Sequence, residues 1–205
     1  MRVQEQDWTI EQGETFQRIV RWETLPLIYK PITAITKAAP VAITAVGHGL
    51  PDGWRATVAS AGGMRQINAQ NWPPRPTDFH RVTVSDVNTV TMNEVNSASY
   101  TAYTSGGSLV YYTPVDLVGY TARMQIRTSP SSTDTLLAIT SADAQPLSGI
   151  TLDNTAKTIT LFISATDTAA LDFSSAVYDL ELESADGVVT RILKGNVLLD
   201  PEVTQ

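Results

Sequence analysis

The residues best suited to metal chemistry are two histidines and two aspartates. His48 and His80 are the only histidines, and the chain has no cysteine, so a zinc site would have to use them with carboxylates such as Asp52 and Asp78. His48, however, lies between two glycines in a predicted turn, and His80 begins a predicted strand. Turn and strand roles explain both histidines better than a metal does, and we predict no metal site.

Three carboxylates at alternate positions, Asp179, Glu181 and Glu183, form a second candidate set. Residues i and i+2 of a strand share a face, so two of these could act as the paired acid and base of a glycosidase. Leu180 and Leu182 lie between them and Tyr178 precedes them, which places apolar groups on the opposite face. This alternation favours a solvated outer strand face over a catalytic pair.

Aspartates followed by Gly or Asn, at 52–53, 153–154 and 186–187, could suggest calcium loops. None has the spaced acidic ligands of a calcium-binding loop, and turn formation explains each of them. The chain also lacks a glycine-rich phosphate loop and a G-x-S-x-G motif. We therefore predict no catalytic, metal-binding or cofactor-binding residues, no cofactor and no enzymatic activity.

Aromatic residues in the middle of the chain are the remaining candidates for binding. Exposed aromatic rings can stack on sugars or anchor a protein interface, but a small domain also needs large side chains in its core. Core packing is the first interpretation, a protein interface the second and glycan binding the third. The residues are Trp54, Trp72, Tyr100, Tyr103, Tyr111 and Tyr112.

Composition predicts an all-β protein of one large or two small domains. The chain has 205 residues, a formal net charge of −7 and 42% hydrophobic residues. Abundant Thr and Val favour strands with polar outer faces, and the acidic balance argues against a nucleic-acid partner. The chain has no apolar run long enough for a transmembrane helix and no apolar signal-peptide core, so we predict no membrane association. The lack of cysteine fits assembly in a reducing cytoplasm or a virion part outside the secretory route.

The segment from Tyr178 to Pro201 gives the clearest strand signal. Its alternating apolar and acidic residues lead to Asp186-Gly187, which predicts a two-residue hairpin turn with both central residues at positive φ. Gly195 predicts a bulge in the return strand. A lone hairpin is marginal in water, so other strands must pack on it.

Elsewhere the pattern predicts short strands, loops and one helix. Residues 7–22 alternate well enough to predict two strands. The prolines of residues 71–79 predict an extended surface loop. Residues 164–173 form the helix candidate, with Thr166 or Asp167 as its cap.

The middle of the chain differs in composition and charge from its two ends. Residues 32–112 contain five basic and four acidic residues, a net charge of +1, which leaves −8 for the rest. Two prolines in residues 25–31 indicate a linker there. We predict an antiparallel, Ig-like β-sandwich from residues 1–31 and 113–205, interrupted by a small β-barrel-like domain of residues 32–112.

The carboxy-terminal part resembles a known family. The stretches DLVGYTARMQIR, GITLDNTAKTITLFISATDTAAL and YDLELESADGVVTRILKGNVLLDPEVT occur in this order. In these stretches the chain resembles tailed-bacteriophage virion proteins, and it is similar to the amino-terminal domain of the upper baseplate protein of lactococcal phages. The resemblance also covers the opening strands.

The middle part resembles a module that recurs in phage tail proteins. The resemblance is carried by ITAITKAAPVAITAVGHGLPDG, GGMRQIN, FHRVTVSDVNTVTM and YTAYTSGGSL. This module is sometimes labelled after a half-domain of ubiquitin-activating enzymes, but a chain without cysteine cannot share that chemistry. The stretch NWPPRPTDFH departs from the plainer strand expected at its position.

The resemblances imply a structural virion protein of a phage tail tip, baseplate or neck, which joins the symmetric tail core to peripheral parts. The implied partners are other tail, baseplate or neck proteins and further copies of the chain, in a three-fold or six-fold oligomer. Assembly in the bacterial host cytoplasm and a final place in the virion are expected. The alternative is a carbohydrate-binding receptor-recognition module that uses Trp72 and nearby tyrosines.

Overall fold

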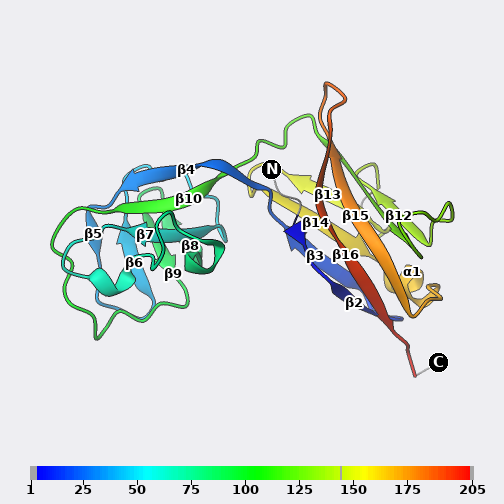
Figure 1. Ribbon diagram of the computed structural model, residues 1–205, viewed down its shortest axis with the longest axis horizontal. Helices are drawn as coiled ribbons and strands as arrows, with labels where there is room; N and C mark the ends of the chain where they lie inside the picture. Colours follow the sequence, from blue (N-terminus) through cyan, green and yellow to red (C-terminus); the bar gives the residue numbers. More distant parts are fainter. Residues whose placement is uncertain (1–3, 144, 204–205) are drawn as a thin grey trace. The chain divides into compact units, whose positions relative to one another are not determined.

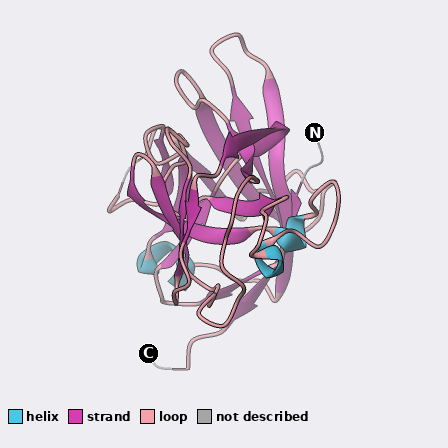
Figure 2. Ribbon diagram, turned by 90° about the vertical axis from the view of Figure 1, so that its left-hand side faces the viewer, coloured by secondary structure: helices cyan, strands magenta, loops and turns pink. Residues whose placement is uncertain are grey.

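The computed structural model describes residues 4–143 and 145–203. Strands make up 47% of the structure and helices 6%, and the sheets are largely antiparallel, so the predicted all-β fold is confirmed. Figure 2 shows how few of the segments are helical. The chain forms two compact units (Figure 1). The first unit contains the described residues up to Trp22 and from Val115 onward, and the second unit is Glu23–Pro114.

The first unit is built from two sheets around one hydrophobic core. Its strands are β1 (Gln4–Glu5), β2 (Trp8–Glu11), β3 (Phe16–Val20), β11 (Thr121–Arg127), β12 (Leu137–Thr140), β13 (Gly149–Asp153), β14 (Thr158–Ile163), β15 (Ser175–Glu183) and β16 (Val189–Asp200). The larger sheet has the order β1, β16, β15, β11, β12, with β2 also paired to β16, and the smaller sheet has the order β13, β14, β3. Apolar residues of both sheets, such as Met124 and Leu161, are buried together.

Alternation decides which side chains of the larger sheet enter this core. In β11, Met124 and Ile126 are buried, whereas Arg123 and Gln125 point away from the core. The same period holds along β15, as the sequence predicts. One face of the sheet is therefore apolar, and the other is free to carry charged residues.

The β15–β16 hairpin is present, but its turn differs from the prediction. Ala185 and Asp186 occupy the central positions of a turn in which the Gly187 amide donates to the Ser184 carbonyl at 2.9 Å. Only Gly187, at φ +77°, has positive φ in this turn, so the prediction of two such residues is wrong. A three-residue loop needs a single left-handed residue, and glycine adopts that conformation without strain.

Gly195 is not at a bulge, contrary to the prediction. The register shift between β15 and β16 instead leaves Ile192 as the extra residue. A Cβ at Gly195 would overlap the carbonyl oxygen of Gln6 and press on the Tyr178 ring. The Tyr178 hydroxyl donates to the same carbonyl at 2.7 Å. Glycine is needed here because the amino-terminal segment passes directly over β16.

The helix α1 (Ala165–Ala169) is present, with a different cap from the one predicted. Ser164 is its N-cap, and its hydroxyl accepts a hydrogen bond from the Asp167 amide at 3.1 Å. The Asp167 carboxylate accepts from the hydroxyls of Ser148 and Ser164, which lowers the pKa of Asp167. Thr166 and Asp167 lie inside the helix, so neither is the cap.

The second unit is one continuous sheet with two short 3-10 turns. Its strands are β4 (Glu23–Pro31), β5 (Ala34–Ile35), β6 (Val41–Thr44), β7 (Arg55–Ala59), β8 (His80–Asp86), β9 (Thr89–Met92) and β10 (Ser108–Pro114), and its 3-10 turns are η1 (Arg65–Ile67) and η2 (Pro76–Asp78). The sheet order is β4, β10, β7, β8, β9, β6, β5. Its core contains Trp54 and Tyr111, which are fully buried.

Residues 25–31 are not a linker. They belong to β4, which pairs with β10 along its length, so the second unit begins at Glu23 rather than at residue 32. Proline cannot donate to a strand ladder, and both prolines are tolerated because β4 is an edge strand with a partner on one side only. The proline signal thus excluded a central strand but not an edge strand.

Candidate functional site

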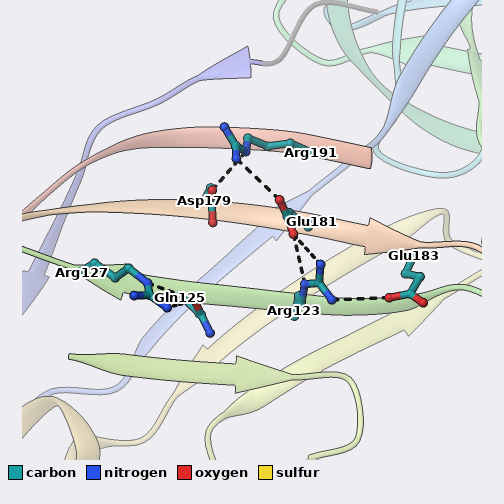
Figure 3. Close-up of polar contacts among 7 residues, drawn as sticks. All are labelled: Arg123, Gln125, Arg127, Asp179, Glu181, Glu183 and Arg191. Atoms are coloured by element: carbon teal, nitrogen blue, oxygen red, sulfur yellow. Dashed lines mark hydrogen bonds and ion pairs between the residues drawn. The ribbon is translucent and has the colours of Figure 1, made fainter. Parts of the chain in front are cut away.

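The outward face of the larger sheet carries a row of cross-strand ion pairs (Figure 3). Arg123 of β11 contacts Glu181 at 2.9 Å and Glu183 at 3.4 Å. Arg191 of β16 contacts Asp179 at 3.0 Å and Glu181 at 3.6 Å. Strand pairing places Glu181 directly between the two arginines, so the register itself brings opposite charges together.

Except for Glu183, these side chains line an open groove with a volume of about 830 Å³. On the side of the amino-terminal strands, Lys194 pairs with Glu5 at 2.7 Å, and Asp7 accepts from the Asn196 amide at 2.8 Å. The groove is lined by equal numbers of carboxylates and cations, although not all of them pair: Glu5, Asp7, Asp179, Glu181, Arg123, Arg127, Arg191 and Lys194.

The structure brings the three predicted carboxylates, Asp179, Glu181 and Glu183, onto one face. In a glycosidase, the paired carboxylates flank the bond that is cleaved. Here each carboxylate faces an arginine instead. The arrangement favours a role in holding neighbouring strands together.

Arg127 differs from the other cations of the groove. Its Nε and Nη2 donate to Gln125 Oε1 at 3.1 and 2.8 Å (Figure 3). Its Nη1 donates to the Ser132 carbonyl at 2.6 Å. Within the described part of the chain, it forms no ion pair with a carboxylate. Val177 stands opposite Arg127, at the position where the neighbouring rows have an acidic residue. The guanidinium therefore keeps an uncompensated charge and two further N–H donors.

Negative charge without an ion-pair partner among the described residues occurs on the same sheet, where β2 pairs with the end of β16. Glu11 and Asp200 are partners in that parallel register, and both are exposed. Partial desolvation, together with the neighbouring Asp200 and Glu14, raises the pKa of Glu11. Neither Glu11 nor Asp200 forms an ion pair with any described residue. Sequence reasoning missed both this pair and Arg127, because strand pairing rather than spacing creates them.

The two histidines are not brought together. His48 is buried, its Nδ1 accepts from the Leu50 amide at 3.0 Å, and its Nε2 donates to the Asp86 carbonyl at 3.0 Å. The Tyr111 hydroxyl donates to the His48 carbonyl. Both ring nitrogens of His48 are thus used by the backbone, whereas His80 is half-buried in β8. Among residues 4–143 and 145–203, no group of three His, Cys, Asp or Glu residues could hold a metal ion.

The aspartates of the predicted turns bind backbone amides. Asp52 Oδ1 accepts from the Val84 amide at 2.9 Å. Asp153 Oδ1 accepts from the amides of Thr155 and Ala156 at 2.8 and 2.9 Å. The Asp153 contacts lie within its own turn, as the sequence predicts, whereas Asp52 binds an amide of the distant strand β8.

The aromatic candidates divide into core residues and one exposed residue. Trp54 and Tyr111 are fully buried, while Tyr100 and Tyr103 pack against the same core. Tyr112 packs on Phe79 with 4.9 Å between ring centroids. Trp72 is the exception, with 72% of its surface exposed. Core packing therefore explains most of the cluster but not Trp72.

Trp72 forms an exposed aromatic corner with Tyr29 of β4, a residue that sequence reasoning did not single out. The ring centroids are 6.4 Å apart and the planes are inclined at 59°. Tyr29 is 45% exposed. The pair could have been found only by knowing that β4 is an edge strand beside the loop that holds Trp72.

The loop of residues 69–79 lies largely at the surface, as the prolines of residues 71–79 predict, but it is not extended throughout. It contains the turn η2, and the carboxylate of Asp78 lies inside it. That carboxylate accepts from the amides of Gln70 and Arg75 at 3.2 and 2.7 Å and from the Asn71 side chain at 3.1 Å. The hydrogen bond from Arg75 is the main cause that lowers the pKa of Asp78. A charged acceptor thus closes the loop and fixes its shape.

No protein-family model matches this sequence, and no curated protein is significantly similar to it. None of the helices in the described part of the chain is long and apolar enough to cross a membrane. Two surfaces therefore remain from which function can be inferred. They are the charged face of the larger sheet in the first unit and the aromatic corner of the second.

Proposed function

We propose that this protein is a non-enzymatic structural component of a tailed-phage virion, at the tail tip, baseplate or neck. It joins the symmetric tail core to peripheral parts by protein–protein contacts, as a three-fold or six-fold oligomer beside other tail, baseplate or neck proteins. It is assembled in the host cytoplasm and works in the virion. The two sequence resemblances support this placement.

The observation that carries the non-enzymatic part of the proposal is the ion-pair row. The only clustered carboxylates that the sequence offered for catalysis, Asp179, Glu181 and Glu183, each contact an arginine. Both ring nitrogens of His48, a metal-ligand candidate, form hydrogen bonds with backbone groups. Surface complementarity and repetition by symmetry are then the mechanism, rather than bond making.

The two units differ in charge, which suits a connecting role. The second unit has six basic and five acidic residues, a net charge of +1, and the remaining residues carry −8. Surfaces of different charge select different partners, because electrostatic complementarity sets specificity and on-rate. A chain with two such units can bind two different neighbours.

Purified virions of the phage that encodes this chain provide the test. Mass spectrometry of the particles should find the chain, and a reconstruction should place it in the tail with a copy number that is a multiple of three. Absence from particles, or one asymmetric copy, would contradict the proposal. So would turnover of a substrate by the purified protein at enzyme-like rates of about 1 per second or more.

A second candidate function is carbohydrate binding, and the exposed aromatic corner is the observation that favours it. Tyr29 and Trp72 present two inclined rings, and the buried Asp78 carboxylate fixes the loop that holds Trp72. Aromatic faces can stack on the apolar faces of sugar rings. Such a site would serve receptor recognition at the tail.

A glycan array tests this candidate. Binding to one class of sugar that is lost in Trp72→Ala and Tyr29→Ala, but kept in Val87→Ala, would support it. Val87 is a suitable control because it is 69% exposed in the same unit, in the turn between β8 and β9. If the array shows no binding while Trp72→Ala reduces incorporation into particles, the corner is a protein contact.

A further inference from the structure

Among the described residues, Arg127 is the cation of the larger sheet's outward face that forms no ion pair. Arg123, Arg191 and Lys194 all pair with carboxylates. Arg127 is held only by Gln125 and the Ser132 carbonyl, which are neutral. A guanidinium held in a fixed orientation by neutral acceptors is well suited to receive a carboxylate.

The same face carries two adjacent carboxylates that form no ion pair with any described residue. Glu11 and Asp200 lie side by side on β2 and β16, and both point outward, because their neighbours Ile10 and Leu199 are buried in the core. Two adjacent like charges disfavour each other in the ionised form. A guanidinium placed between them would relieve that repulsion.

Within one copy these groups are too far apart to meet. Arg127 stands opposite Val177, and Val177 stands opposite Asn196, so two strand spacings separate Arg127 from β16. Asp200 lies four residues beyond Asn196 along β16. With about 4.8 Å between strands and about 3.4 Å per residue, the Cα atoms of Arg127 and Asp200 are about 16 Å apart.

A second copy can satisfy both groups at once. Arg127 and the Glu11–Asp200 pair lie on one face of one sheet, so a two-fold axis through the point midway between them exchanges their positions. That midpoint lies near Ser175 and Leu198, which pair in register and point outward. Leu198 is 53% exposed, and a two-fold contact here would cover it together with Val177.

We propose that two copies of this chain bind each other through the outward faces of their larger sheets, with Arg127 of each copy pairing with Glu11 and Asp200 of the other. This contact rests on the proposed role as a repeated subunit. It joins copies in pairs and is therefore distinct from the head-to-tail contacts that close a three-fold or six-fold ring. The net charge of −8 outside the second unit opposes association. The pairing is therefore weak between free chains and gains strength where an assembly holds copies close together.

A cysteine at the expected axis tests the contact directly, because the natural chain has none. Ser175→Cys places two thiols across the axis, and a disulfide forms readily only where the two Cα atoms come within about 7 Å. Mild oxidation of the full-length variant at about 100 μM should give a disulfide-linked dimer on a non-reducing gel. Val118→Cys, at a 71% exposed site of the same unit, is the matched control and should stay largely monomeric.

Charge variants in the Ser175→Cys background test the pairing itself. Arg127→Glu should slow cross-linking by about tenfold, since the two-fold axis removes two ion pairs with one substitution. Adding Glu11→Arg should restore much of the rate by reversing the pair. Arg65→Glu makes the same change in net charge in the second unit and should have little effect. Asp200→Arg replaces Arg127→Glu if the latter fails to fold.

Equal cross-linking of Ser175→Cys and Val118→Cys would overturn the two-fold contact. Equal slowing by Arg127→Glu and Arg65→Glu would also overturn it, because the effect would then come from net charge alone. Either result leaves the proposed function standing, since that function is decided by the presence and copy number of the chain in purified particles.

Discussion

The charged sheet face of the first unit and the loop around Asp78 in the second use carboxylates in opposite ways. On the first unit, arginines and carboxylates stand on an outward sheet face and pair across strands, as Arg123 does with Glu181. In the second unit, the Asp78 carboxylate lies inside a loop and binds the amides of that loop. Exposed ion pairs contribute little to stability, whereas an enclosed carboxylate with several donors fixes a backbone conformation. The first arrangement shapes a surface, and the second presents one exposed tryptophan.

Removing the second unit would test most strongly whether the two units are independent. The Val115 amide donates to the Trp22 carbonyl at 3.3 Å, so the chain ends left by excision already lie together. Replacing Glu23–Pro114 with a short Gly-Ser linker should leave a first unit that folds with a single cooperative transition. Failure of this shortened chain to fold, while the full chain folds, would show that the units depend on each other.

A single methyl group at Gly195 should give the largest effect of any point substitution considered. The added Cβ of Gly195→Ala would overlap the Gln6 carbonyl. The nearby Tyr178 ring leaves β16 little room to shift away from that overlap. We expect a loss of about 3 kcal/mol in the unfolding free energy of the first unit, measured by urea denaturation. The second unit should keep its own transition. A change below about 0.5 kcal/mol would mean that the amino-terminal segment is not held against β16.

Gly187→Val should cost less, because only backbone conformation opposes it. Gly187 has φ +77°, and no atom lies within 4 Å of the position of an added Cβ. A β-branched residue in the left-handed region costs about 1–2 kcal/mol. Thermal unfolding measures the loss, and Gly187→Asn is the control, since asparagine tolerates this conformation better. Equal losses for Val and Asn would point to a cause other than φ.

Acid should open the loop of the second unit, because the Asp78 carboxylate that closes it becomes protonated at low pH. The pKa of Asp78 is lowered in the folded protein, so its contribution to stability is complete above an unfolded-state pKa of about 3.9 and is lost as the pH falls through the lowered value. Trp72 fluorescence and amide exchange in residues 69–79 should therefore change below about pH 4. Asp78→Asn should remove this pH dependence, and an unchanged profile in that variant would assign the transition to another group.

Breaking one exposed ion pair should have the smallest effect. The Arg123 side chain is 51% exposed, so Arg123→Ala should lower the unfolding free energy of the first unit by about 0.5 kcal/mol, and high salt should reduce the difference. A double-mutant cycle with Glu181→Ala measures the coupling. A coupling above about 2 kcal/mol would mean that the pair is screened from solvent more than its exposure indicates.

Local sequence indicated strands such as β11 and β15 and the face that each of their side chains takes, whereas it missed β4. The alternation around Met124 and Leu180 placed apolar groups inward and charged groups outward, because successive strand residues point to opposite faces. Turn aspartates such as Asp153 were also readable, since a carboxylate next to free amides binds them locally. These features depend on residues only a few positions apart.

Tertiary structure alone decided which of these residues meet. Tyr29 joins Trp72, Gly195 faces Gln6, and Arg127 stands opposite Val177 instead of an acid, all through strand pairing or packing between distant segments. Register between strands far apart in sequence depends on the whole core, and a shift of one residue would turn every side chain to the other face. The periodicity of a single strand contains no information about its partner, so neither the groove nor the aromatic corner could be predicted from it.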